Sequence, residues 1–255
     1  MLKRGVRGRL WLLLSLCCLS LSTSAANLNV AVAANFIAPM KALVERFQQQ
    51  GGQPVRVAYG SSGKLYAQIV NGAPFDLLLS ADQDKPVRLE AAGVAVAGSR
   101  FTYAEGQLVL WSLRFNLPEE PQSLLAGDSY RYLALANPRL APYGMAAEQV
   151  LQRLQLDQLT LSRRVQGENI AQTYQFVASG NAEYGFVALS QVLEQGEIRR
   201  GSGWIVPLSL YDPIRQDAVL LNRGADNPQA REFLRFLRSD EARAIIRAHG
   251  YRLDP

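Results

Sequence analysis

An alternation of short apolar strands and amphipathic helices constrains the fold more than any other feature of this sequence. It runs from residue 29 to residue 92 and predicts strands at 29–33, 54–59 and 75–80 and helices at 39–50, 63–70 and 85–92. In the first helix, Met40, Leu43, Val44 and Phe47 recur on one face. Strands that are joined by helices pair in parallel, so the pattern predicts a parallel sheet with helices on its faces.

The remainder of the chain has the same character. Strands are expected at 107–112, 131–136, 182–188 and 204–207, and helices at 144–154 and 170–179, before a helical C-terminus. No segment rich in Pro, Gly or Ser separates two halves, which indicates that the chain crosses between them more than once. We therefore expect an α/β protein of two lobes, each a mostly parallel sheet flanked by helices. The first lobe is expected at 27–106 and 211–255, and the second at 107–210.

Residues 1–26 are typical of a cleaved secretory signal peptide. Four basic residues between Lys3 and Arg9 precede an apolar run from Leu10 to Leu21, and small residues follow as far as Ala26. The apolar run is too short to span a bilayer, which takes about 20 residues. An uncleaved anchor is the alternative for this segment. We expect cleavage before Asn27 and export to the periplasm.

The charge of the chain is nearly balanced once this segment is set aside. The 255 residues contain 27 Lys and Arg against 22 Asp and Glu. Four of the basic residues and none of the acidic ones lie in 1–26, which leaves 23 basic and 22 acidic residues. A chain this close to neutrality has no electrostatic footprint for nucleic acid, so no nucleic-acid partner is expected.

Cysteine and histidine are too scarce for most metal chemistry. Both cysteines, Cys17 and Cys18, lie in the signal segment, and His249 is the single histidine. Zinc and iron sites are built from clusters of these residues, so we expect no resident cofactor. The position of His249 in Ala-His-Gly near the C-terminus is that of a residue at a helix end.

Polar turns stand at the starts of four expected helices. They are Ala34-Asn35-Phe36, Gly60-Ser61-Ser62-Gly63, Pro142-Tyr143-Gly144 and Glu168-Asn169-Ile170. Helix N-termini present backbone N–H groups that bind anions. Asn and Ser are also the common helix caps, so one such turn alone would indicate little. Four of them, two in each expected lobe, favour an anion site.

The turn at residues 60–65 (GSSGKL) leaves two enzymatic interpretations to weigh. It is similar to a P-loop, but it lacks the four-residue spacer, and Leu65 stands where Ser or Thr would hold magnesium. A secreted serine hydrolase that uses Ser62 is the alternative from a different functional class. A chain with one histidine offers little support for a Ser-His-Asp triad.

The same turns belong to a longer set of landmarks. The others are Gly72-Ala73-Pro74-Phe75-Asp76-Leu77, Ser80-Ala81-Asp82, Asn137-Pro138 ahead of Ala141-Pro142-Tyr143-Gly144, and Glu183-Tyr184-Gly185-Phe186-Val187. With this set the chain resembles the periplasmic molybdate-binding proteins of ABC importers. The resemblance covers essentially Asn29 to Leu253.

The resemblance implies a two-lobed type II binding-protein fold with an oxyanion in the cleft. It assigns to the first lobe the Asn35 side chain with the adjoining Ala34 backbone, and the hydroxyl and amide of Ser62. It assigns to the second lobe the amides of Tyr143 and Ile170. Molybdenum would then be held through the molybdate oxygens and not by direct metal ligation.

Two positions depart from the usual pattern of the family. Ala188 stands where many members have a Tyr whose hydroxyl reaches the ion, and Asn35 occupies the family's Ser position. In this respect the chain resembles a branch in which Asn takes over ligation.

The expected function is capture of molybdate, and of tungstate, by a monomer that delivers the ion to an ABC permease without catalysis. Binding of another tetrahedral oxyanion, sulfate or phosphate, is the alternative within the same class. A phosphate site would want an acceptor for the phosphate proton, and Glu168 is the carboxylate nearest to the expected turns in the sequence. Acidic residues near a helix start are also ordinary capping residues.

Overall fold

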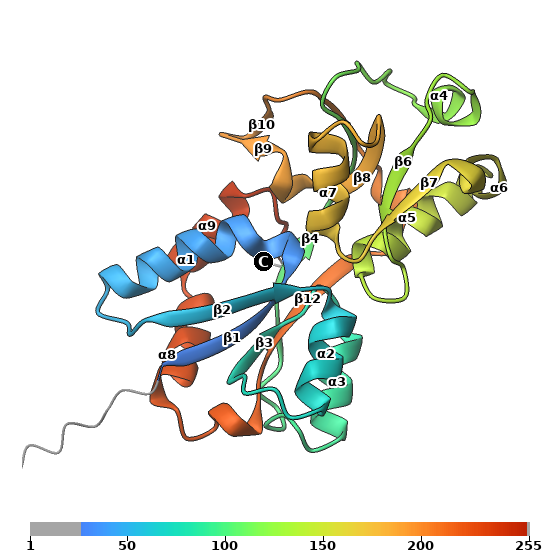
Figure 1. The fold of residues 1–255 in the computed structure, drawn as a ribbon. Helices are drawn as coiled ribbons and strands as arrows, with labels where there is room; N and C mark the ends of the chain where they lie inside the picture. Colours follow the sequence, from blue (N-terminus) through green and yellow to red (C-terminus); the bar gives the residue numbers. More distant parts are fainter. Residues whose placement is uncertain (1–26, 254–255) are drawn as a thin grey trace, which may run out of the picture.

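The computed structural model describes residues 27–253, so the predicted signal segment lies outside the described residues. The described chain forms two five-stranded sheets with helices on their faces, and these make two lobes (Figure 1). Within residues 27–253, no helix combines the length and the apolar character needed to cross a membrane.

The sheet of the first lobe has the strand order β2-β1-β3-β12-β4. Its strands are β1 (Leu28–Ala33), β2 (Val55–Gly60), β3 (Leu77–Leu79), β4 (Phe101–Gly106) and β12 (Ile214–Leu220). As predicted, β1 pairs in parallel with β2 and β3, whereas β12 is antiparallel to both β3 and β4.

The sheet of the second lobe has the order β11-β5-β8-β6-β7. Its strands are β5 (Leu108–Ser112), β6 (Leu133–Ala136), β7 (Arg164–Gly167), β8 (Tyr184–Ala188) and β11 (Ser202–Ile205), and a short hairpin of β9 (Leu193–Glu194) and β10 (Glu197–Ile198) lies beside it. β6 is parallel to β7 and β8, and β5 is antiparallel to β8 and β11.

The two-lobed α/β class is therefore confirmed, but both sheets are mixed and not mostly parallel. The antiparallel pairs involve the strands next to the two places where the chain passes from one sheet to the other, residue 107 and residues 206–213. A strand that enters a sheet from the opposite lobe comes in from the far end. It therefore runs against the strands that are joined by helices.

Helices cover both faces of each sheet (Figure 1). The first lobe has α1 (Ile37–Gln49), α2 (Ser62–Val70), α3 (Asp84–Ala91), α8 (Pro228–Leu237) and α9 (Asp240–Ala248). The second has α4 (Gln122–Ala126), α5 (Pro142–Arg153), α6 (Asp157–Thr160) and α7 (Ile170–Ala178). The expected helices agree with these to within a few residues. The strands β4, β7 and β12 and the short helices α4 and α6 were not predicted.

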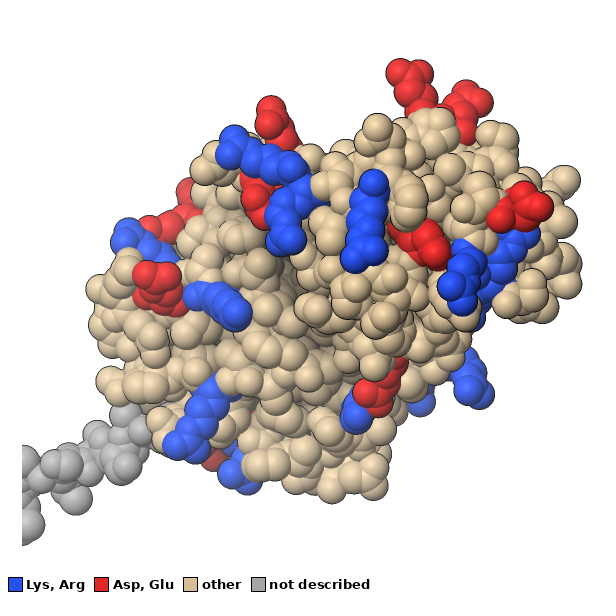
Figure 2. Space-filling model, turned by 45° about the horizontal axis from the view of Figure 1, so that its top comes forward, with Lys and Arg blue, Asp and Glu red and all other residues tan. Residues whose placement is uncertain are grey.

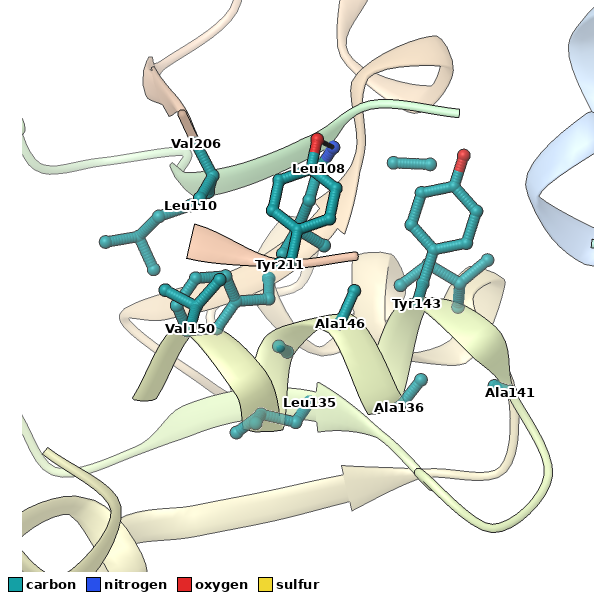
Figure 3. Close-up of a cluster of buried hydrophobic side chains, with 14 of the residues drawn as sticks. Leu108, Leu110, Leu135, Ala136, Ala141, Tyr143, Ala146, Val150, Val206 and Tyr211 are labelled. Carbon is teal, nitrogen blue, oxygen red and sulfur yellow. Dashed lines mark hydrogen bonds between the residues drawn. The ribbon is translucent and has the colours of Figure 1, made fainter. Parts of the chain in front are cut away.

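Side-chain alternation along the strands explains why each lobe has two cores. In β1, Val30 and Val32 pack with α1, α8 and α9 on one face, while Ala31 packs with α2 and α3 on the other. In the second lobe, Leu108 and Leu110 of β5 join a core with α5. Figure 3 shows Val150 of α5 pointing toward Leu110 and Val206, and Ala146 pointing toward Tyr211, in that core. These cores fix the helix starts that border the space between the lobes.

Candidate anion-binding site

The predicted site residues come together in one cavity between the lobes. Ala34, Asn35 and Ser62 line it from the first lobe, and Tyr143 and Ile170 line it from the second. The cavity volume is about 10 Å³, room for little more than one water molecule and far below the roughly 300–1,000 Å³ of pockets for drug-sized ligands. The size suits a small ion.

Each of these residues stands at or beside the start of a helix. Ala34 begins a 3₁₀ turn, η1 (Ala34–Phe36), that leads directly into α1, and Ser62 begins α2. Pro142 and Ile170 begin α5 and α7. The first N–H groups of a helix have no acceptor within the helix, and they carry the positive end of its dipole. Helix starts from both lobes, with N–H groups that have no acceptor within the helix, thus line one small space.

The second lobe directs two amides toward the cavity. Pro142 has no N–H, and the amide of Gly144 donates to the carbonyl of Ala141, so the Tyr143 amide is the first-turn donor that faces the cavity. At α7, Asn169 Oδ1 accepts from the amides of Ala171 and Gln172, both at 3.0 Å. The Asn169 side chain does not bond the amide of Ile170, which stays available to a ligand.

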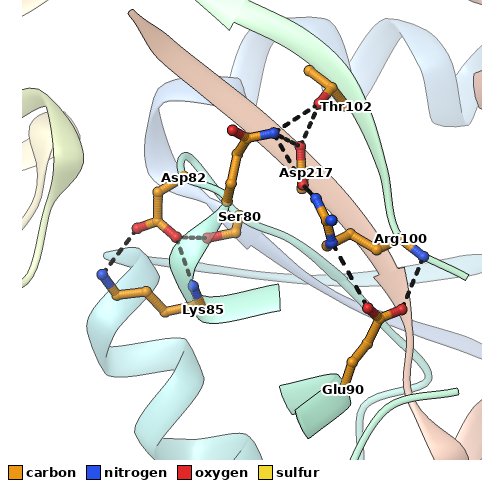
Figure 4. Close-up of polar contacts among 8 residues, drawn as sticks. Ser80, Asp82, Lys85, Glu90, Arg100, Thr102 and Asp217 are labelled. Atoms are coloured by element: carbon orange, nitrogen blue, oxygen red, sulfur yellow. Dashed lines mark hydrogen bonds and ion pairs between the residues drawn. The ribbon is translucent and has the colours of Figure 1, made fainter. Parts of the chain in front are cut away.

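Ser62 lines the cavity, and its hydroxyl accepts a hydrogen bond from within the protein. Its Oγ accepts a hydrogen bond of 2.9 Å from the backbone amide of Ala81, in the loop after β3. Asp82 holds that loop through Ser80 Oγ and the amide of Lys85 (Figure 4). Since the Ser62 oxygen already accepts, its proton is left to donate.

Ser61 is a site residue that the sequence reasoning missed. Its Oγ lines the cavity, is buried, and has no hydrogen-bond partner in the described structure. A buried hydroxyl without a partner costs about 1–3 kcal/mol, so an acceptor in the cavity would offset this cost. The signal in the sequence was the doubled serine ahead of α2, from which only the second was chosen.

The side chain of Asn35 does not have the free donors that the resemblance implied. Its Nδ2 donates to Gln216 Oε1 and to Tyr251 Oη, both at 2.9 Å. The amide hydrogens are therefore used inside the protein, and the backbone N–H in η1 is the donor that Asn35 can offer to an anion. Ala188, the other departure, is fully buried and does not line the cavity.

Contacts across the cavity mouth hold the lobes together. The amide of Gly63 donates to the carbonyl of Leu140 at 2.9 Å, and Lys64 Nζ forms an ion pair of 2.7 Å with Glu168. Glu168 is thus paired at the surface. Asn35, Ser62, Tyr143 and Ile170 are only 1–3% exposed, so the lobes must separate before an ion can enter or leave. The structure shows the closed arrangement.

The cavity lining carries no Arg, Lys, Asp or Glu. Within residues 27–253 there is no group of His, Cys, Asp and Glu arranged to hold a metal ion. His249 ends α9, with Nδ1 bonded to the carbonyl of Ile245 at 2.8 Å, as its sequence position predicts. On the face shown in Figure 2, basic and acidic side chains are interspersed. The cavity therefore offers uncharged hydrogen-bond donors.

Residues 28–252 match the family of bacterial extracellular solute-binding proteins. The chain belongs to this family. Among its relatives, a protein of Azotobacter vinelandii named molybdate-binding protein ModA is 50% identical over 92% of this chain and 93% of its own length. A protein of the same name from Rhodobacter capsulatus is 45% identical over 91% of each chain.

Solved structures share the fold. The structure of the periplasmic molybdate-binding protein of Azotobacter vinelandii superposes with a TM-score of 0.86 at 42% identity, and covers 90% of this chain and 100% of its own. The sulfate-binding protein SubI of Mycobacterium tuberculosis superposes with a TM-score of 0.68 at 13% identity, which is a likeness of fold alone. The relatives described here are named as binding proteins and not as enzymes.

Proposed function

We propose that this chain binds molybdate in the cavity between its lobes and passes it to the membrane permease of an ABC importer. The observation that carries the proposal is the closed, uncharged cavity bordered by helix starts from both lobes. The relatives named molybdate-binding protein, at 50% and 45% identity, support molybdate as the ion.

The proposed donors are the backbone amides of Ala34, Asn35, Tyr143 and Ile170 and the hydroxyls of Ser61 and Ser62, with the Ser62 amide. Molybdate is a dianion at neutral pH whose oxygens only accept hydrogen bonds. Donors of this kind satisfy it without a counter-charge, and hydrogen bonds to a charged acceptor are the stronger ones. The positive ends of the helix dipoles add to the attraction. The metal atom is reached only through the oxygens.

The remaining parts of the proposal concern the setting. Export through the segment 1–26, with cleavage before Asn27, would place the protein in the periplasm as a monomer. Tungstate, which is close to molybdate in size and charge, is the proposed second ligand. No catalytic step, resident cofactor or nucleic acid takes part.

Selectivity follows from the rigid donors. Sulfate has the same charge and shape but shorter bonds to oxygen, so donors fixed on two lobes cannot all reach it. Each buried N–H left unpaired costs about 1–3 kcal/mol. Phosphate carries a proton at neutral pH, and that proton would face a donor. We therefore expect both anions to bind much more weakly than molybdate.

Thermal unfolding with each anion tests the proposal. A ligand at 100 times its Kd stabilises the folded state by about 2.7 kcal/mol, which for a chain of this size raises Tm by roughly 5–11 °C. Molybdate and tungstate should give this shift, and sulfate and phosphate little at the same concentration. An equal shift with sulfate would assign the cavity to another oxyanion. Turnover of ester substrates that is abolished by Ser62→Ala would indicate the hydrolase instead.

A further inference from the structure

Behind the anion cavity, buried polar side chains of both lobes form one hydrogen-bonded cluster. Its members are Asn35, Tyr103, Tyr143, Ser190, Gln216 and Tyr251, all of them buried. Two of these residues, Asn35 and Tyr143, also line the cavity. The cluster therefore reaches the proposed anion contacts from the protein interior.

The turn that carries Asn35 is anchored to the opposite lobe. The carbonyl oxygen of Asn35 accepts from Ser190 Oγ and from Tyr251 Oη, both at 2.8 Å. Ser190 lies in the 3₁₀ turn η3 (Leu189–Gln191) directly after β8, in the second lobe. A first-lobe turn that faces the anion is thus held by a second-lobe hydroxyl.

Tyr143 is anchored in the reverse direction. Its amide faces the cavity from the second lobe, and its hydroxyl accepts a hydrogen bond of 3.4 Å from Gln216 Nε2 on β12 of the first lobe. Gln216 Oε1 accepts in turn from Asn35 Nδ2 at 2.9 Å and from Tyr103 Oη at 3.0 Å. One glutamine therefore joins the two cavity residues.

The backbone where the chain crosses between the lobes leaves room for this arrangement. A Cβ on Gly106, at the end of β4, would stand 2.1 Å from the Tyr143 hydroxyl, so only glycine fits there. Burial raises the pKa of Tyr251 to about 12. Its hydroxyl is therefore protonated, and able to donate, at neutral pH.

We propose that Ser190 and Gln216 are positioning residues for anion binding, because each bonds a cavity residue of the opposite lobe. The inference deepens the proposed function and rests on it. When the lobes separate, the bonds from Ser190 to Asn35 and from Gln216 to Tyr143 break, and when the lobes close they form again. The cluster stabilises the closed state and sets the donors of both lobes in register for the ion.

Dissociation kinetics of molybdate test this role with matched controls. Ser190→Ala removes the bonds of Ser190 Oγ with Asn35 and with Tyr251, and Tyr143→Phe removes the bond of its hydroxyl with Gln216. Both variants keep every backbone amide. Ser112→Ala and Tyr130→Phe remove buried hydroxyls that bond to the carbonyls of Glu183 and Leu125 within the second lobe. The first pair should raise the dissociation rate about 2- to 12-fold, the equivalent of one buried hydrogen bond. Neither control should change this rate, although both should lower Tm.

A measurement without anion keeps this inference separate from the identity of the ligand. Spin labels at Gln68→Cys on α2 and Gln158→Cys on α6, with Cys17 and Cys18 replaced by Ser, report the distance between the lobes. Ser190→Ala and Tyr143→Phe should lower the population of the short distance in the free protein, and the controls should leave it unchanged.

The two measurements fail in different ways. Wild-type protein that does not bind molybdate would remove the proposed ligand, and the distance populations would still decide the role of the cluster. If the distance populations and dissociation rates of both Ser190→Ala and Tyr143→Phe equal those of the wild type, the positioning role of the cluster is overturned. Equal changes in the controls would reduce the cluster to an ordinary contribution to folding.

Discussion

Replacement of Gly63 by alanine is expected to impair lobe closure without harming the folded lobes. A Cβ at this position would meet the Cα of Leu140 at 3.1 Å and its carbonyl oxygen at 3.2 Å, and both atoms belong to the opposite lobe. The Gly63 amide donates to that same carbonyl in the closed arrangement. The added methyl group must therefore push the lobes apart by a few tenths of an ångström.

The expected loss of affinity follows from the cost of overpacking. An extra methylene in a well-packed contact costs about 1–3 kcal/mol. Because this cost opposes closure around the anion, the affinity for the anion should fall about 5- to 150-fold. The free protein gains, because alanine is the better helix former by up to about 1 kcal/mol and Gly63 lies in the first turn of α2. Affinity and stability should thus change in opposite directions.

Calorimetric titration with molybdate and thermal unfolding of the free protein measure the two effects. Gly127→Ala is the control, because its Cβ meets the Ser123 carbonyl at 3.3 Å within one lobe; its affinity for the anion should equal that of the wild type. Unchanged affinity in Gly63→Ala would refute closure at this contact. A fall in Tm together with affinity would indicate damage to the lobe itself.

Three further changes test other parts of the site. Ser61→Ala and Ser62→Ala should each weaken molybdate binding by roughly 10- to 150-fold in titrations, but only Ser62→Ala should lower the Tm of the free protein, because it leaves the Ala81 amide unpaired; wild-type affinity would remove either hydroxyl from the site. Lys64→Ala breaks an exposed ion pair and should weaken binding less than about 5-fold, with the difference vanishing at high salt; a larger, salt-independent loss would contradict this. Burial raises the pKa of Tyr103, Tyr143 and Tyr251 above the unfolded value of about 10. The stability from their burial should be complete below pH 10 and fall as the pH rises toward 12; urea midpoints that do not fall over this range would contradict it.

Apolar strands and amphipathic helices could be predicted because their residues carry the signal locally. β1 and β3 are apolar runs, and α1 has a clear apolar face. β12 could not be predicted in this way, because Gln216 and Asp217 interrupt it with polar side chains that are fully buried. Asp217 is paired there with Arg100 and Thr102 of neighbouring segments (Figure 4). Partners more than a hundred residues away make that strand possible.

In the site, too, some features are encoded locally and others depend on residues far away in the sequence. Helix starts after strands pointed to the turns that line the cavity, because N-terminal amides are a property of local structure. The use of the Asn35 side chain could not be read locally, since its partners Gln216 and Tyr251 come from the end of the chain. Ser62 and Ser61 differ only in their surroundings. The Ser62 hydroxyl accepts a hydrogen bond from the Ala81 amide, whereas the Ser61 hydroxyl has no partner in the described part of the chain.

The crystal structure of the protein with molybdate, with anomalous diffraction at the molybdenum edge, tests the central claim most directly. The account predicts one strong peak between the lobes, with oxygens within about 2.7–3.2 Å of the hydroxyls of Ser61 and Ser62 and of the amides of Tyr143 and Ile170. No charged side chain should contact the ion. A peak outside this cavity, or an ion ligated by a carboxylate, lysine or arginine, would contradict the account.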